Sequence, residues 1–163
     1  MKQSAFCTLA VIAFLIVSLS SPAVTVAADT GNPFGLGIIS GEPTGVSGKF
    51  WIDGNSAIDG AVAWSFAKDF NFHIHADWLF HNWTFLKKSF EVEQGEIPLY
   101  YGVGGRMRFD DDPRVGVRFV VGLAYMWDNA PFDVFFEVAP VLDLAPETEL
   151  DGNIAIGVRY WFQ

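Results

Sequence analysis

Apolar and polar residues alternate along eight stretches of this chain, and the last stretch shows the alternation most clearly. One face of that stretch is apolar and consists of Ile154, Ile156, Val158, Tyr160 and Phe162. The other face is more polar and consists of Asn153, Ala155, Gly157, Arg159 and Trp161. Because successive side chains of a β-strand point to opposite sides, a period of two predicts strands. The pattern predicts strands at roughly 34–41, 44–53, 57–67, 70–84, 96–109, 114–127, 132–143 and 152–162.

The breaks between these stretches are rich in Gly, Pro, Asn and Asp, which favour turns for backbone reasons. Examples are Glu42-Pro43, Asp53-Gly54-Asn55 and the run from Asp110 to Pro113. The longest break is residues 87–95. An even number of antiparallel strands of about 9–11 residues is typical of small membrane barrels. We therefore predict an all-β fold, an eight-stranded antiparallel up-and-down transmembrane β-barrel.

The two faces of the predicted strands differ in charge. Bulky apolar residues fill one face, as in Val115, Val117, Phe119, Val121 and Leu123. The other face receives small residues and most of the charges, which we expect to form a network in the lumen: Lys49, Asp59, His73, His75, Asp77, Arg106, Arg108, Arg118, Asp133, Glu137 and Arg159, with His81 nearby. Four apolar residues are also expected inside: Leu79, Val120, Phe135 and Val141. A water-soluble barrel such as a lipocalin has the reverse polarity, so the pattern favours a barrel surrounded by lipid.

The first residues have the pattern of a secretory signal peptide. Lys2 precedes an apolar run, residues 5–19, and a small-residue cleavage site, Val26-Ala27-Ala28. We expect cleavage after this site, which leaves a signal peptide at 1–28 and a barrel domain at 29–163. The apolar run is shorter than the ~20 residues of a spanning helix, so an uncleaved anchor is the less favoured alternative.

Composition and charge narrow the alternatives. The chain is 51% hydrophobic, yet no long unbroken apolar run follows residue 19, which excludes spanning helices and leaves alternating strands. A net charge of −9 argues against nucleic acid as a partner, because phosphates require a basic surface. The only cysteine, Cys7, lies in the predicted signal, so we expect no disulfide and no cysteine-ligated metal in the mature chain.

The mature segment as a whole resembles the small eight-stranded bacterial outer-membrane barrels of the OmpA/OmpX type. The ending Val158-Arg159-Tyr160-Trp161-Phe162 is similar to the C-terminal signal by which such proteins are recognised for insertion, although Gln163 follows it here. The segment Pro98–Arg106 looks like one found in other bacterial barrels. The resemblance implies the bacterial outer membrane as the location, with outer-membrane lipid and the barrel-insertion machinery as partners. It assigns Tyr160 and Phe162 to the insertion signal and implies no activity.

One motif could bind a metal. His73, His75 and Asp77 form His-x-His-x-Asp on one face of a predicted strand, and imidazole and carboxylate at this spacing can converge on Zn²⁺. The interpretation that we favour is a hydrogen-bonded network with neighbouring charges, because a structural zinc site usually needs four ligands. We therefore expect neither a metal nor another cofactor.

The charged interior leaves several functions open. We favour a non-enzymatic, monomeric, structural barrel whose lumen is plugged by paired charges, because eight strands leave little interior space. A narrow pore is the first alternative. A lipid-modifying enzyme is the second, although no His-x-Ser pair accompanies Ser56, Ser65 or Ser89. A soluble, lipocalin-like binding protein is the third.

Overall fold

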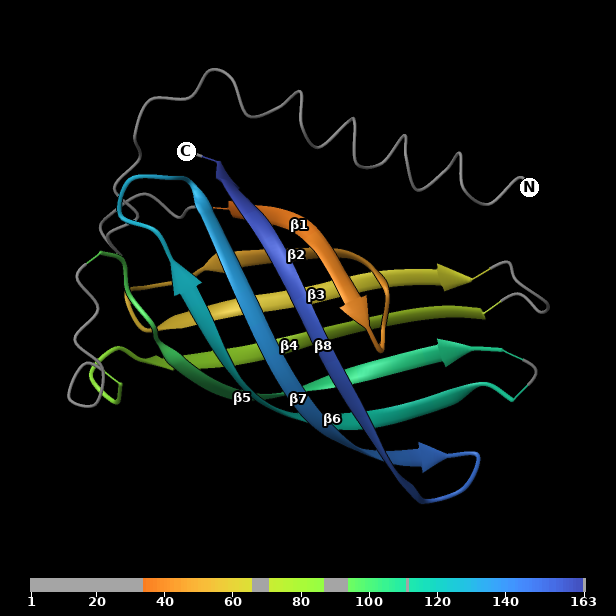
Figure 1. Ribbon diagram of the computed structural model, residues 1–163. Coiled ribbons are helices and arrows are strands. Elements are labelled where there is room, and N and C mark those ends of the chain that lie inside the picture. The colour runs from red at the N-terminus through yellow and green to blue at the C-terminus, as the bar shows by residue number, and fades with distance from the viewer. Residues whose placement is uncertain (1–33, 66–70, 87–93, 111, 163) are drawn as a thin grey trace, which may run out of the picture.

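The computed structural model describes residues 34–65, 71–86, 94–110 and 112–162. The predicted signal peptide at 1–28, with Cys7, lies outside these ranges. The described residues form a single closed antiparallel barrel (Figure 1). Its strands are β1 (Phe34–Gly41), β2 (Gly45–Trp51), β3 (Ser56–Ser65), β4 (Asn71–Asn82), β5 (Leu99–Phe109), β6 (Arg114–Met126), β7 (Phe132–Ala145) and β8 (Glu149–Phe162).

The strands follow one another around the barrel in chain order, and β8 closes against β1. The closing register runs from Phe34 opposite Phe162 to Gly41 opposite Ala155. This up-and-down order confirms the predicted eight-stranded closed barrel. Closure leaves no exposed sheet edge along the paired part of the wall. Across the described ranges, no helix is long and apolar enough to cross a membrane.

The largest difference from the predicted strands concerns the last hairpin. We expected a turn from Pro146 to Gly152, whereas β8 already begins at Glu149 and pairs with the end of β7. Turn-forming residues were a misleading signal here, because Asp151 lies in the strand and pairs with an arginine of the interior. β5 also begins at Leu99, three residues later than expected, after an isolated bridge between Glu96 and Met126.

The turn between β2 and β3 is held by one carboxylate. Asp53 accepts hydrogen bonds from the backbone N–H groups of Asn55 and Ser56, both at 2.7 Å, and from the Ser56 hydroxyl. These contacts, the Ser56 hydroxyl first among them, lower the pKa of Asp53. The turn is therefore a side-chain-capped loop of the kind that Asp favours.

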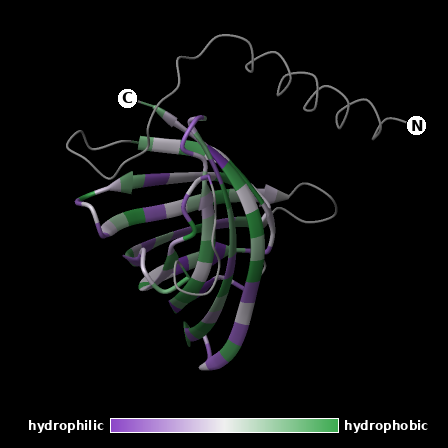
Figure 2. Ribbon diagram, turned by 60° about the vertical axis from the view of Figure 1, so that its left-hand side comes forward, coloured by the Kyte–Doolittle hydropathy of each residue, from purple (hydrophilic) through white to green (hydrophobic). Residues whose placement is uncertain are grey.

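The two faces of the wall have opposite polarity, as the alternation predicts. The outward face is bulky and apolar, and its most exposed members include Ile38, Trp64, Trp78, Tyr101, Phe119, Val121, Phe136, Ile154 and Ile156. Charged and small residues face inward, together with Leu79, Val120, Phe135 and Val141. Figure 2 shows the resulting alternation of hydrophilic and hydrophobic residues along the strands.

Outward aromatic rings gather where the strands meet the C-terminus. Tyr160 lies edge-on to Phe132 at 5.3 Å and to Phe162 at 4.9 Å between ring centroids. Phe162 in turn stacks on Phe34 at 6.2 Å. Inside the barrel at the same end, Trp51 and Trp161 pack together, 6.2 Å apart, in a second apolar cluster. Aromatic rings therefore lie on both faces of the wall at this end.

Close approach of β1 and β8 requires a glycine at position 37. A Cβ atom there would lie 1.8 Å from the Val158 carbonyl oxygen and 2.6 Å from the Arg159 Cα. Both are backbone atoms that cannot rotate away, so we expect Gly37→Ala to lower the free energy of unfolding by about 1–3 kcal/mol. Urea unfolding measures the loss. Gly152→Ala is the matched control, because a Cβ at Gly152 meets nothing within 4 Å; equal losses in both variants would contradict the argument.

Candidate functional site

The candidate site is the charged interior. Ten of the eleven residues predicted for the lumen network are buried: Lys49, Asp59, His73, His75, Asp77, Arg106, Arg118, Asp133, Glu137 and Arg159. The eleventh, Arg108, has a side chain that is 24% exposed at one mouth of the barrel. They come from strands β2 to β8, so nearly the whole wall contributes. Buried charges need partners, and the interior supplies them in layers.

The first layer is centred on Arg159 of β8. Its Nε donates to Asp133 Oδ1 on the neighbouring strand β7 at 3.1 Å. Its Nη1 donates to Asp59 on β3, far around the wall, so the guanidinium crosses the lumen. The Arg159 guanidinium also lies 4.0 Å from the centre of the Phe135 ring. One cation thus ties β8 to β7 and β3 with its charge compensated on both sides.

The second layer is centred on Arg118 of β6. Its Nη2 donates to Glu137 Oε1 on β7 at 3.0 Å, and its Nε lies 3.3 Å from Asp77 Oδ2 on β4. Its Nη1 contacts His75 Nδ1 at 3.0 Å. Arg118 therefore links β6 to β7 and, past β5, to β4, so that, like Arg159, it joins strands that are not neighbours in the wall.

The third layer contains residues that sequence reasoning missed. Arg106 of β5 makes a two-pronged contact with Asp143 of β7, at 3.2 and 2.7 Å, and donates to Asp151 at 2.6 Å and Asn153 at 3.4 Å. Asp143 is fully buried. The signal for it was present, because Asp143 shares the inward phase of Asp133 on the same strand. Asp151 could not be found this way, since we expected it in a turn.

Lys49 lies apart from these ion pairs. Its ammonium contacts His81 Nε2 at 2.7 Å and lies 4.8 Å and 5.0 Å from the ring centres of Trp51 and Tyr100. Within the described ranges, no carboxylate comes within salt-bridge distance of it. The aromatic faces supply part of the compensation, because their electron-rich surfaces attract cations.

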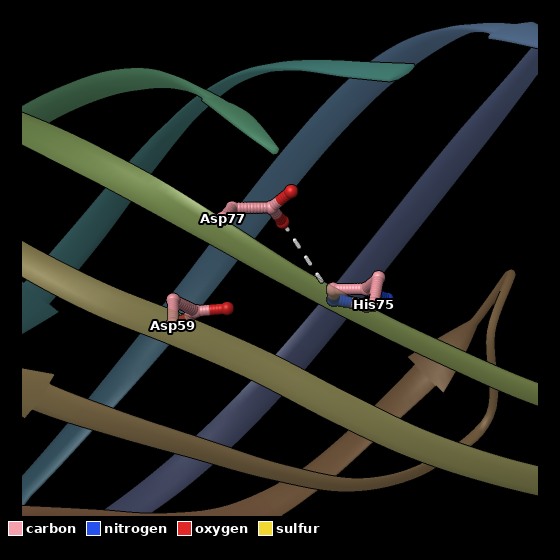
Figure 3. Close-up of side chains that lie close together, drawn as sticks. All are labelled: Asp59, His75 and Asp77. Carbon is pink, nitrogen blue, oxygen red and sulfur yellow. Dashed lines mark ion pairs between the residues drawn. The ribbon is translucent and has the colours of Figure 1, made fainter. Parts of the chain in front are cut away.

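The His-x-His-x-Asp motif of β4 is only partly brought together. His75 Nδ1 and His73 Nε2 lie 3.3 Å apart, and His75 Nε2 lies 3.8 Å from Asp77 Oδ2. Asp59 joins them, because it pairs directly opposite Asp77 in the β3–β4 register (Figure 3). His81 does not, since it lies further along β4 against Lys49.

A cavity of about 460 Å³ opens at the mouth next to the β1–β2 hairpin. Its lining includes Trp64, His73, Arg106, Arg108, Asp151 and Asn153. The two arginines are already paired here, Arg108 with Asp110 at 2.7 Å and Arg106 with Asp151. The cavity therefore offers little free positive charge to an anion.

Comparisons with protein-family models, with curated proteins and with solved structures found no match to this chain.

Proposed function

We propose that this chain is an outer-membrane β-barrel whose paired interior charges close the lumen, so that it serves as a rigid, non-enzymatic element of the bacterial envelope. The observation that carries the proposal is the polarity of the wall. Charged side chains such as Arg118 and Asp133 are fully buried, while Trp78, Tyr101 and Phe119 are about half exposed around the outside. An apolar exterior of this kind is favourable in hydrocarbon and costly in water.

The closed hydrogen bonding of the wall supports the same location. A segment in hydrocarbon must satisfy its backbone groups internally, and a closed barrel achieves this without a free edge. The outward aromatic rings of Tyr160, Phe162 and Phe34 lie together at one end, where such rings favour the headgroup region. Tyr160 and Phe162 in this proposal also form the signal read by the barrel-insertion machinery.

A plug accounts for the interior better than a pore. Arg159 and Arg118 each bridge distant strands, and each is held by two carboxylates within 3.3 Å or less. Removing one partner of such a group leaves an uncompensated buried charge, so these bridges are expected to stay closed. We propose that the barrel is a monomer, since its apolar exterior would then be covered by lipid.

Gel mobility of the mature protein from isolated outer membranes tests the proposal. We expect the unheated protein to migrate differently from the boiled protein, because a closed barrel in lipid resists detergent. If the protein instead appears in the soluble periplasmic fraction and shows no shift, the membrane location is wrong and a lipocalin-like binding protein takes its place.

Planar-bilayer recordings on the same preparation separate plug from pore. We expect no steady single-channel current from the wild-type barrel, because the buried ion pairs of Arg159 and Arg118 occupy the lumen. A reproducible unitary conductance would contradict the plug and leave the membrane location intact.

A further inference from the structure

Two carboxylates face each other directly inside the barrel. Asp59 of β3 and Asp77 of β4 are register partners, and both are buried. Like charges at directly opposed positions destabilise a pair of strands. Asp59 has Arg159 as its partner, whereas the one cationic side chain near Asp77 among the described residues is Arg118, whose Nε lies 3.3 Å from Oδ2 and which also pairs with Glu137. Asp77 is therefore less well compensated than Asp59.

The unpaired atoms next to Asp77 point to the same deficit. In the part of the chain that the structure describes, neither Asp77 oxygen accepts a hydrogen bond, and His75 Nε2 has no hydrogen-bond partner. The side chains of His75 and Asp77 are 0% and 1% exposed. Buried polar groups are nearly always paired, so a cluster of unpaired ones requires an explanation.

The charges of the two adjoining layers give that explanation. The buried carboxylates here are Asp59, Asp77, Asp133 and Glu137, and the buried cations are Lys49, Arg118 and Arg159. The carboxylates are in excess by one, and Arg106 is occupied elsewhere by Asp143 and Asp151. A cation placed beside Asp77 would offset this excess and the repulsion between Asp59 and Asp77.

We propose that Asp59, His75 and Asp77 bind a divalent transition-metal ion of the Zn²⁺ class as its three protein ligands, with water in the fourth position that such sites keep open. One ligand atom from each lies within 4.8 Å of the others (Figure 3). If each of these atoms moves inward by roughly 1 Å or less, all three can lie about 2.0–2.2 Å from an ion at their centre, which is the ligand distance of Zn²⁺. An imidazole with two carboxylates suits zinc-like ions better than Mg²⁺ or Ca²⁺, which take oxygen ligands alone.

The neighbours of His75 fit this role with one rearrangement. Coordination through Nε2 places the ring proton on Nδ1, from which it can be donated to His73 Nε2, now 3.3 Å away. Metal-bound histidines typically donate their second ring N–H to a neighbouring acceptor, and the His73 ring nitrogen takes that place here. Arg118 Nη1 must then leave His75 Nδ1, and the guanidinium keeps Glu137 as its partner.

The candidate site lies close to the cavity at the barrel mouth. His73 lines the cavity of about 460 Å³ at the barrel mouth, and His75 is the next inward residue along β4. The motif therefore extends from the cavity at the mouth toward the buried carboxylates. The inference depends on the barrel interior and not on the location of the barrel.

The test is titration of the folded mature barrel with Co²⁺, followed by competition with Zn²⁺. We expect one equivalent to bind, with a visible Co²⁺ spectrum that Zn²⁺ abolishes. His75→Gln and Asp77→Asn should each weaken binding by at least about tenfold, because even outer partners of metal ligands contribute about 10–100-fold. His81→Gln is the matched control, since it removes an inward histidine of the same strand that contacts Lys49 instead.

Three results would overturn the site: no binding by the wild-type barrel, undiminished binding by His75→Gln and Asp77→Asn, or an equal loss in His81→Gln. Retained gel mobility shows that each variant is folded. Should the variants not fold, proton NMR of the wild-type Co²⁺ form decides. A single paramagnetically shifted, exchangeable imidazole N–H supports the site, and no such signal refutes it.

Discussion

Replacing Arg159 with methionine should lower the free energy of unfolding by about 3–5 kcal/mol, because the change leaves two buried carboxylates without a compensating positive charge. Asp59 and Asp133 both depend on this guanidinium, and their side chains are 5% and 0% exposed. Methionine keeps much of the length and apolar contact of arginine, so the loss reports the charge. Urea unfolding, in the detergent or lipid in which the barrel folds, measures it.

A matched control is Arg114→Met at the barrel rim. The side chain of Arg114 is 28% exposed and that of its nearer partner Glu149 is 62% exposed. Its second contact, with buried Asp143, is long at 3.7 Å, and Asp143 keeps the two-pronged contact with Arg106, so we expect a loss below about 1 kcal/mol. Adding Asp59→Asn and Asp133→Asn to Arg159→Met should recover part of the stability, since the uncompensated charges are then gone. A loss in Arg159→Met no larger than that in Arg114→Met would show that the interior is solvated rather than plugged.

The location of these charges could be predicted from the sequence because a strand has a strict period of two. Asp133 and Arg159 each alternate with apolar neighbours, so their phase assigns them to one face before any pairing is known. The same phase correctly assigns Leu79 and Phe135 to the interior, although their chemistry suggests the exterior. Phase is a local property, and local properties are what a single sequence records.

The partners within the interior could not be predicted in the same way. Arg159 and Asp59 are separated by 100 positions, and their contact depends on the curvature that closes the barrel. The His-x-His-x-Asp spacing therefore gave no indication that Asp59 lies beside His75 and Asp77. It also gave no indication that His81 lies apart from them. Two side chains on the same face of one strand can belong to different layers of the interior, because they lie at different positions along the barrel axis.

Replacing Val121 with arginine should cost about 2–4 kcal/mol of stability in a lipid bilayer, since charge at the midplane of a barrel's lipid face is expensive. Val121 lies near the middle of β6, is 53% exposed, and pairs with Tyr101 and Val138 on either side. Its outward position leaves no interior partner for the guanidinium. Unfolding of the barrel in lipid vesicles measures the difference from wild type.

Val121→Leu is the matched control, because it changes the size of the same side chain and leaves the face apolar; we expect a change within about 0.5 kcal/mol. The two variants together distinguish a barrel that is surrounded by lipid from one that is surrounded by water. In water an exposed arginine in place of valine has almost no cost, whereas in hydrocarbon it must reach the interface or disturb the bilayer. If Val121→Arg is as stable as wild type in vesicles, the apolar exterior does not face lipid, and the cluster of half-exposed aromatic residues must be covered by protein instead.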